Sequence, residues 1–170
     1  CAGMSYSFTG KVFKFADNIN TDYIISSRRK RDTLDLNVLK HYIMEDIRPG
    51  FFEELSDANI LVAGENFGCG SAMEVAAQVV KANNVGAVIA KSFSRSYFRN
   101  CINNGLLVVQ MNTDSIREGD ELHVRMDAGK IFVDNRTTGE QFTAEGYSPE
   151  LSRMILAGGV MNDLDSFMGK

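Results

Sequence analysis

A glycine-rich stretch that ends in a serine is the clearest candidate for chemistry in this sequence. It reads Gly64-Glu-Asn-Phe-Gly68-Cys-Gly70-Ser71. Glycine tolerates positive φ and lets the backbone approach a ligand closely, and the free N–H groups of a following helix attract anions. The stretch lacks the lysine of a nucleotide-binding P-loop and the third glycine of the dinucleotide fingerprint, so nucleotide binding is not supported. It indicates either an anion site or only a tight structural connection.

Two side chains of this glycine loop (residues 64–71) leave alternatives open. Ser71 stands where the next helix should begin, so it is either the helix N-cap or a catalytic hydroxyl whose alkoxide is stabilised by nearby positive groups. Cys69 is either a thiol nucleophile or a small residue that packs under the loop, and we favour the second role. Neither His41 nor His123 has cysteine or carboxylate partners at metal-ligand spacing. The sequence therefore predicts that this chain builds no metal site of its own.

A basic cluster offers a second place for chemistry. It consists of Arg28, Arg29, Lys30 and Arg31. Consecutive cations without an apolar residue between them belong in solvent or against an anion. The stretch 17–22 just before the cluster (Asp-Asn-Ile-Asn-Thr-Asp) is rich in residues that favour turns, which predicts that Asp22 lies on a shaped loop. The apolar residues 23–25 should anchor that loop from behind.

The elements that position these residues follow from the hydrophobic pattern. A strand or hairpin is expected over 6–15, strands over 59–63, 85–89 and 106–109, and helices over 72–83 and 93–103. These βα units predict an α/β fold with a mainly parallel central sheet. Residues 119–142 alternate in polarity, with turns at 128–129 and 138–139, which predicts additional antiparallel hairpins. Further helices are expected over 34–47, with Asp32 or Thr33 as N-cap, and over 151–157.

Length and composition limit the class of protein. The chain has 170 residues, of which 44% are hydrophobic, and this is enough for one domain with a real core. Its formal net charge of -4 argues against nucleic acid as a partner. No apolar run reaches the ~20 residues that span a bilayer, so no membrane partner is expected. The three cysteines suit reduced thiols in the cytoplasm. Residues 1–3 look like an expression scar before Met4, which leaves 4–170 as a single domain.

Three motifs in a fixed order resemble the small subunit of 3-isopropylmalate dehydratase and its relatives in the aconitase superfamily. They are residues 17–25 (Asp-Asn-Ile-Asn-Thr-Asp-Tyr-Ile-Ile), 63–71 (Ala-Gly-Glu-Asn-Phe-Gly-Cys-Gly-Ser) and 88–100 (Val-Ile-Ala-Lys-Ser-Phe-Ser-Arg-Ser-Tyr-Phe-Arg-Asn). The resemblance implies a swivelling β/β/α domain that closes over a large subunit. It also implies that the large subunit carries a 4Fe-4S cluster, with no cofactor bound by this chain.

The resemblance implies a hydro-lyase that needs its large subunit. Such enzymes remove water from a malate-type hydroxy diacid and add it back at the neighbouring carbon, most directly between 3-isopropylmalate and 2-isopropylmalate in leucine biosynthesis. Ser71 matches the base that takes the proton from carbon, Asp22 an active-site aspartate, and Arg31 an arginine that meets a substrate carboxylate. The other positions that match the substrate-binding and glycine-loop region are Gly64, Asn66, Gly68, Cys69, Gly70 and Ala72.

Two departures from the family pattern concern the substrate. Arg29 and Lys30 stand where bulky apolar residues are expected, and Met73 stands where an arginine would grip a carboxylate through two hydrogen bonds. We therefore hypothesise that Arg28, Arg29 or Lys30 supplies the missing charge. The alternatives are a related hydro-lyase for another substituted malate, of the dimethylmalate, homocitrate/homoaconitate or citraconate type, and a catalytically degenerate binding module.

Overall fold

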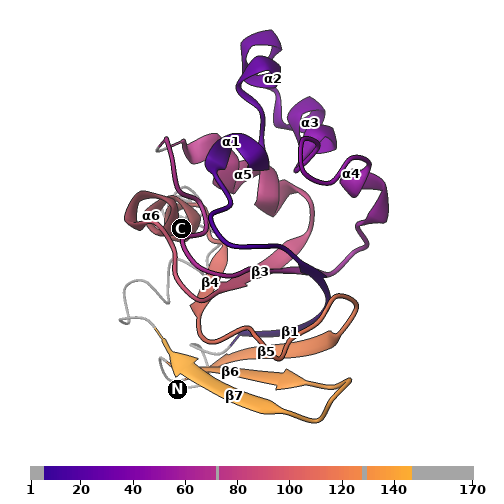
Figure 1. The fold of residues 1–170 in the computed structure, drawn as a ribbon, viewed down its shortest axis with the longest axis vertical. Coiled ribbons are helices and arrows are strands. Elements are labelled where there is room, and N and C mark those ends of the chain that lie inside the picture. Colours follow the sequence, from indigo (N-terminus) through magenta and orange to yellow (C-terminus); the bar gives the residue numbers. More distant parts are fainter. Residues whose placement is uncertain (1–5, 72, 128–129, 147–170) are drawn as a thin grey trace, which may run out of the picture.

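A single mixed β-sheet organises the chain. The structure, a computed structural model, describes residues 6–71, 73–127 and 130–146. Its seven strands lie in the order β4-β3-β2-β1-β5-β6-β7 (Figure 1). Their bounds are β1 (Tyr6–Lys14), β2 (Asn59–Val62), β3 (Val85–Ala90), β4 (Leu107–Gln110), β5 (Glu121–Asp127), β6 (Lys130–Asn135) and β7 (Gln141–Glu145).

Strand β1 joins a parallel half of the sheet to an antiparallel half. Its residues 11–14 pair in parallel with β2, and β2, β3 and β4 continue the parallel pairing. Its residues 6–11 pair antiparallel with β5, and β5, β6 and β7 follow as hairpins. The α/β prediction with parallel strands and additional antiparallel hairpins is confirmed, and the hairpins extend the same sheet.

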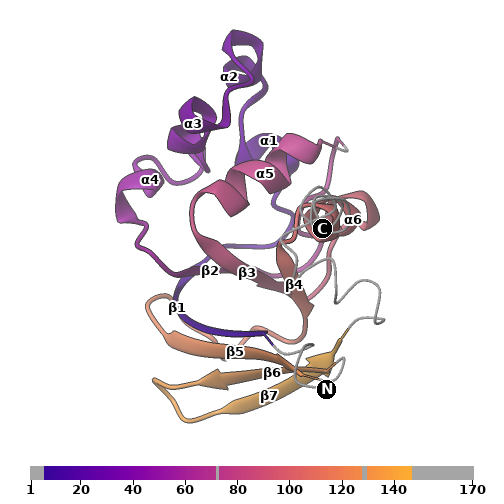
Figure 2. The same cartoon turned by 180° about the vertical axis from the view of Figure 1, so that it is seen from behind.

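The helices lie on the side of the parallel strands. The two longer ones are α5 (Glu74–Ala82) and α6 (Arg95–Asn103), which follow β2 and β3. Short helical segments lie at the opposite end of the molecule from β7 (Figure 2). They are α1 (Thr21–Ile24), α2 (Ser27–Asp32), α3 (Leu36–Leu39), η2 (Lys40–Tyr42) and α4 (Phe51–Glu54).

The core joins the parallel strands and the helices to the buried residues of β5 and β6, such as Val124 and Val133. Every residue of β2 is buried, as expected for a strand covered on both faces. Helix α5 buries one face made of Ala76, Ala77, Val79 and Val80. Helix α6 buries Tyr97, Cys101 and Ile102. This packing fixes the carboxyl ends of β2 and β3, where the glycine loop and the stretch 91–94 begin.

The predicted single helix over 34–47 is wrong. Asp35, and neither Asp32 nor Thr33, is the N-cap of α3, and its carboxylate accepts a bond from the backbone N–H of Asn37 at 2.9 Å. The helical segment ends after η2, and Met44 adopts a φ of 57°. The Met44 N–H donates to the carbonyl of Ile24 at 2.9 Å, so a tertiary bond replaces a helical one.

Three predicted features lie in residues that the structure does not describe. The turn at 128–129, the helix over 151–157 and the scar at 1–3 lie outside the described residues. No helix in the described ranges is long and apolar enough to cross a membrane.

Candidate functional site

The glycine loop runs from the end of β2 toward α5 and depends on close approaches. Gly68 has a φ of 81°, and a side chain there would overlap the ring of Tyr97. Gly70 has a φ of 92°, and a Cβ there would lie 2.6 Å from the amide atoms of Asn20. Both conditions favour glycine, because positive φ and lack of space each exclude a Cβ. The glycine loop is therefore packed between two other segments.

The first of these segments is the stretch 16–21. Backbone bonds join Asn18 N to Glu65 O (2.7 Å), Gly68 N to Ile19 O (2.7 Å), Thr21 N to Cys69 O (2.8 Å) and Gly64 N to Ala16 O (3.4 Å). The amide of Asn66 also donates to Asn18 Oδ1 at 3.2 Å. The Thr21 hydroxyl donates to the carbonyl of Ser71 at 2.9 Å. The first and second sequence motifs thus meet side by side.

The second segment is 92–94, from the third sequence motif. Phe67 N donates to Ser92 O and Ser94 N to Phe67 O, both at 3.0 Å. The Ser94 hydroxyl donates to Gly68 O at 2.8 Å and also caps α6. The three motifs thus form one hydrogen-bonded unit with the glycine loop in the middle.

Ser71 is exposed, and its predicted alternative role as an N-cap is wrong. Helix α5 begins at Glu74 with Met73 as its N-cap, and no side chain caps it. The helix therefore starts three residues after Ser71, and the Ser71 hydroxyl is not used to begin it. Within the described part of the chain, no group hydrogen-bonds this hydroxyl. Ala72, which was expected to bind substrate, lies outside the described residues.

Asp22 lies in the first turn of α1, whereas a loop was predicted. Asn20 caps this helix, because its side-chain oxygen accepts from Asp22 N at 2.8 Å. Ser27 holds the carboxylate: its N–H and its hydroxyl both donate to Asp22 Oδ1, at 2.9 and 2.5 Å. These bonds, with smaller contributions from Lys30 and Arg28, lower the pKa of the Asp22 carboxyl below its usual value. Asp22 is thus an oriented, ionised acceptor at neutral pH.

The basic cluster forms helix α2, and two of its cations pair with carboxylates. Arg29 donates to both oxygens of Glu45, at 2.7 and 2.9 Å, and lies over the ring of Tyr42 at 3.9 Å. Arg28 pairs with Asp46 at 3.3 Å. These two arginines therefore tie α2 to the segment that follows η2, and their charges are already compensated.

The other two cations have no carboxylate partner in the described ranges. The Lys30 ammonium contacts the sulfur of Met73, next to the glycine loop. Arg31 is exposed and takes part in none of the ion pairs found among the described residues. The four predicted substrate-binding cations thus divide into two that anchor α2 and two that are available to a ligand.

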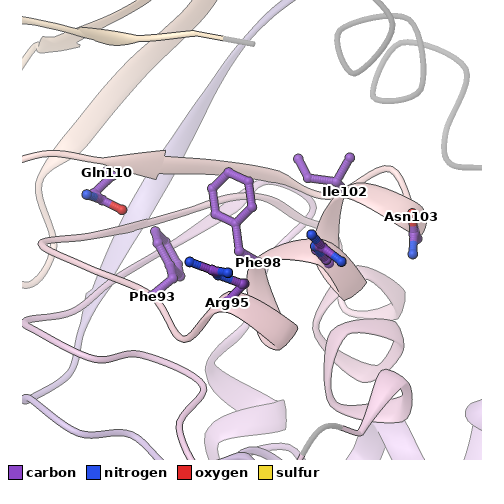
Figure 3. A pocket seen from close by; sticks show the side chains of 7 residues that line it. Phe93, Arg95, Phe98, Ile102, Asn103 and Gln110 are labelled. Atoms are coloured by element: carbon purple, nitrogen blue, oxygen red, sulfur yellow. The ribbon is translucent and has the colours of Figure 1, made fainter. Parts of the chain in front are cut away.

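A pocket of about 740 Å³ lies beside α6 rather than at Ser71 (Figure 3). It is lined by Phe93, Arg95, Phe98, Arg99, Ile102, Asn103 and Gln110. No member of this set belongs to the glycine loop or to α2. The predicted site therefore lies outside this pocket.

The described residues contain no set of metal ligands. No group of three or more His, Cys, Asp or Glu side chains among them could hold a metal ion. Cys69 is half-buried, and Cys101 is buried in α6. His41 packs against Phe52, and His123 contacts the hydroxyl of Thr9.

Sequence reasoning missed several residues that shape the site. They are Asn20, Thr21, Ser27 and Ser94, all of which hold a neighbour through a short polar side chain. The Asn20 cap had a signal, because an asparagine two residues before an acidic residue is typical of a helix start. The contacts of Thr21 and Ser94 reach across the fold and leave no local pattern.

Comparison with known proteins agrees with this arrangement. Residues 44–114 match the aconitase C-terminal domain. The chain is 45% identical over 156 residues to a 3-isopropylmalate dehydratase small subunit from Heliobacterium modesticaldum, which covers 91% of this chain and 92% of that protein. A small subunit from Wolinella succinogenes is 43% identical over 89% of this chain and 90% of its own length.

Solved structures show the same fold. The crystal structure of 3-isopropylmalate dehydratase from Methanocaldococcus jannaschii superposes with a TM-score of 0.88 at 34% identity, over 95% of both chains. Aconitase X from Thermococcus kodakaraensis, at a TM-score of 0.50 and 17% identity, shares the fold alone. The resemblance of the three motifs is thus confirmed over about nine-tenths of the chain, which belongs to the family of 3-isopropylmalate dehydratase small subunits.

Proposed function

We propose that this chain is the small subunit of a heteromeric hydro-lyase that interconverts 3-isopropylmalate and 2-isopropylmalate with a large subunit. Family membership supports this reaction, since the relatives are 3-isopropylmalate dehydratase small subunits, and we propose that the reaction serves leucine biosynthesis. We also propose that the enzyme works in the cytoplasm, where both cysteines of the described chain stay reduced.

The observation that carries the proposal is the joining of Ser71 to the Asp22 segment. The bond from the Thr21 hydroxyl to Ser71 O fixes the serine beside the residue that precedes Asp22. Ser71 itself is exposed and free of helix capping, while Asp22 is held by Ser27. An exposed hydroxyl and an oriented carboxylate on adjacent, hydrogen-bonded segments suit proton transfer at carbon.

Ser71 acts in this proposal as the base. Its alkoxide takes the proton from the carbon next to the hydroxyl-bearing carbon and becomes a hydroxyl. The electron pair of the broken C–H bond forms the double bond, and the hydroxyl group leaves from the other carbon. Water then adds to the double bond. The isomer that forms depends on which of the two carbons receives the hydroxyl. The ionised Asp22 accepts hydrogen bonds and helps to orient the substrate.

The iron-sulfur cluster is proposed to reside on the large subunit. The described residues do not fit such a group, because they hold no cluster of three potential ligands and Cys101 is buried. The steps that this chain supplies are therefore binding, orientation and proton transfer.

The test is anaerobic reconstitution of the complex with its large subunit and iron. The unsaturated diacid is followed by its ultraviolet absorbance, with 3-isopropylmalate and a panel of other substituted malates. Ser71→Ala should lower kcat by about 10² to 10⁴-fold, the range for loss of a positioned base. Ser7→Ala is the matched control, because Ser7 is also exposed but lies in β1, opposite Arg125 of β5 in the antiparallel half of the sheet.

Two results would contradict the proposal in different ways. Turnover that survives in Ser71→Ala would remove the serine from its role as base. A complex that forms with an intact cluster but converts no diacid would instead indicate a degenerate binding module.

A further inference from the structure

One cation beside the glycine loop forms no ion pair with any described residue. Lys30 belongs to α2, which stands on the same side of the sheet as α5 (Figure 1). Its side chain is half-buried, and its ammonium contacts the sulfur of Met73. Met73 is the N-cap of α5, two residues after Ser71. Lys30 therefore links the basic helix to the loop that carries the proposed base.

The described groups around the Lys30 ammonium do not satisfy its hydrogen-bond donors or neutralise its charge. A lysine ammonium has three N–H donors, and a thioether is only a weak acceptor. No carboxylate in the described ranges pairs with Lys30. Burial lowers the pKa of Lys30, which is the sign of a charge that has lost water without full compensation. Such a group favours an anionic ligand.

Asp22 is close enough to influence Lys30 but does not neutralise it. Each charge shifts the pKa of the other toward the ionised form, yet no ion pair joins them. Asp22 instead accepts both bonds from Ser27. The ammonium is thus oriented by its neighbours and keeps donors for a ligand.

The other cations of the cluster fit this role less well. Arg29 is held by both oxygens of Glu45 and by the ring of Tyr42, and Arg28 by Asp46. A substrate would have to break these pairs before either guanidinium could bind it. Arg31 is free of ion pairs among the described residues, but it is exposed and lies at the far end of α2 from Asp22.

We propose that Lys30, seated against Met73, binds one carboxylate of the hydroxy diacid and so selects substrates with an anionic group facing α2. This inference rests on the hydro-lyase function proposed above. It selects Lys30 from the three candidate cations, Arg28, Arg29 and Lys30. In this arrangement Lys30 on α2 supplies the positive charge that Met73, next to the glycine loop, cannot supply.

The first test measures kinetics of the reconstituted complex with Lys30→Met and Lys30→Arg. Loss of a charge-assisted bond to the carboxylate should raise KM for the diacid about ten- to a hundredfold, with a smaller change in kcat. Lys30→Arg should retain most of the affinity. Lys40→Met is the matched control, because Lys40 is also half-buried but lies in η2, outside both the basic cluster and the glycine loop. Equal melting temperatures and equal complex formation exclude misfolding.

A second readout separates charge recognition from a structural role. Inhibition constants are measured for the unsaturated diacid and for each of its two monomethyl esters. The wild-type complex should bind the diacid at least about tenfold better than the ester that blocks the carboxylate at Lys30. Lys30→Met should lose this preference, which a merely structural effect of the substitution would not remove.

A double variant transfers the positive charge from position 30 to position 73. Met73→Arg in the Lys30→Met background should restore much of the diacid affinity, because a guanidinium then stands on the other side of the same contact. In the wild-type background the same substitution should weaken binding or stability, since two cations would be adjacent.

The outcomes distinguish this inference from the proposed function. If the wild-type complex converts no diacid, the hydro-lyase function fails and Lys30 has no substrate to bind. If wild type converts the diacid and Lys30→Met keeps KM within twofold with an unchanged diacid preference, the role of Lys30 is overturned while the function stands.

Discussion

The hydroxyl of Thr21 donates a 2.9 Å hydrogen bond to the carbonyl of Ser71, across fifty residues of chain. Thr21 is buried, with 1% of its surface exposed, so water cannot replace the bond. The same residue donates its backbone N–H to Cys69 O at 2.8 Å. Thr21 thus holds the glycine loop in register with α1, and it positions Ser71 without touching a reacting atom.

Thr21→Val should weaken both the fold and the activity of the complex. Valine keeps the shape but leaves the Ser71 carbonyl without its donor, at a cost of about 1–3 kcal/mol in the free energy of unfolding. Thr113→Val is the matched control, because the buried Thr113 hydroxyl donates to Ala63 O at 2.7 Å. Urea titration should show similar losses in both variants, and kcat should fall much further for Thr21→Val. Equal kcat values in the two variants would contradict the positioning role.

Gly70→Ala should damage the site beyond the effect of its backbone angle. Gly119 has a similar φ of 88° with nothing within 4 Å of its Cβ position, so Gly119→Ala measures the strain of positive φ alone, about 1–2 kcal/mol. At Gly70 the new methyl group also displaces Asn20, which caps the helix that carries Asp22. Thermal unfolding and kinetics of both variants check this, and activity should fall only for Gly70→Ala. A loss confined to stability would show that Asn20 moves without effect on Asp22.

The sequence predicted the fold well where the signal was local. The apolar run of β2 and the alternation in β5 and β6 mark strands whatever their partners are. The helix over 34–47 failed because its end depends on a bond between Met44 N and Ile24 O, which hydrophobic periodicity cannot show. Asp35 is the N-cap of α3, although Asp32 and Thr33 are equally suitable residue types for that position.

The candidate site was predictable in its parts and less so in its contacts. The glycine loop and Asp22 were visible from residue types, and the structure brings their segments together. Which cation of the basic cluster is available could not be predicted, because Glu45, Asp46 and Met73 lie far from it in sequence. Glu45 and Asp46 pair with Arg29 and Arg28, whereas Lys30 contacts only the Met73 thioether and stays available to an anion.

Arg48→Met should make the fold less stable at neutral pH, with a smaller effect in acid. The Arg48 guanidinium bonds Glu118 and Glu54, each at 2.7 Å, and these bonds lower the pKa of both carboxyls. A carboxyl with a lowered pKa stabilises the fold above its unfolded value near 4.5, and this contribution disappears as pH falls through the folded pKa. The difference in unfolding free energy between wild type and Arg48→Met should be about 1 kcal/mol at pH 7 and should shrink below pH 4.5.

Urea titrations at several pH values measure that difference. Arg125→Met is the control for lost ring packing, because Arg125 lies over Phe132 at 4.2 Å and has one longer ion pair, with Asp127 at 3.3 Å. A gap between wild type and Arg48→Met that stays constant from neutral to acidic pH would assign the effect to the aromatic contacts of Arg48 instead of its carboxylate partners.

The two described cysteines should differ sharply in reactivity, and neither should be a nucleophile. Burial raises the pKa of the Cys101 thiol, so in a Cys1→Ser background a thiol reagent should label Cys69 in the native protein and Cys101 only after unfolding.

Neither histidine accompanies Cys69, since His41 packs against Phe52 and His123 against Thr9. Cys69→Ser should therefore keep kcat within a few-fold of wild type in the reconstituted complex, because its side chain only packs there. A loss of nearly all activity, with the melting temperature unchanged, would instead identify Cys69 as the reacting group and displace Ser71 from that role.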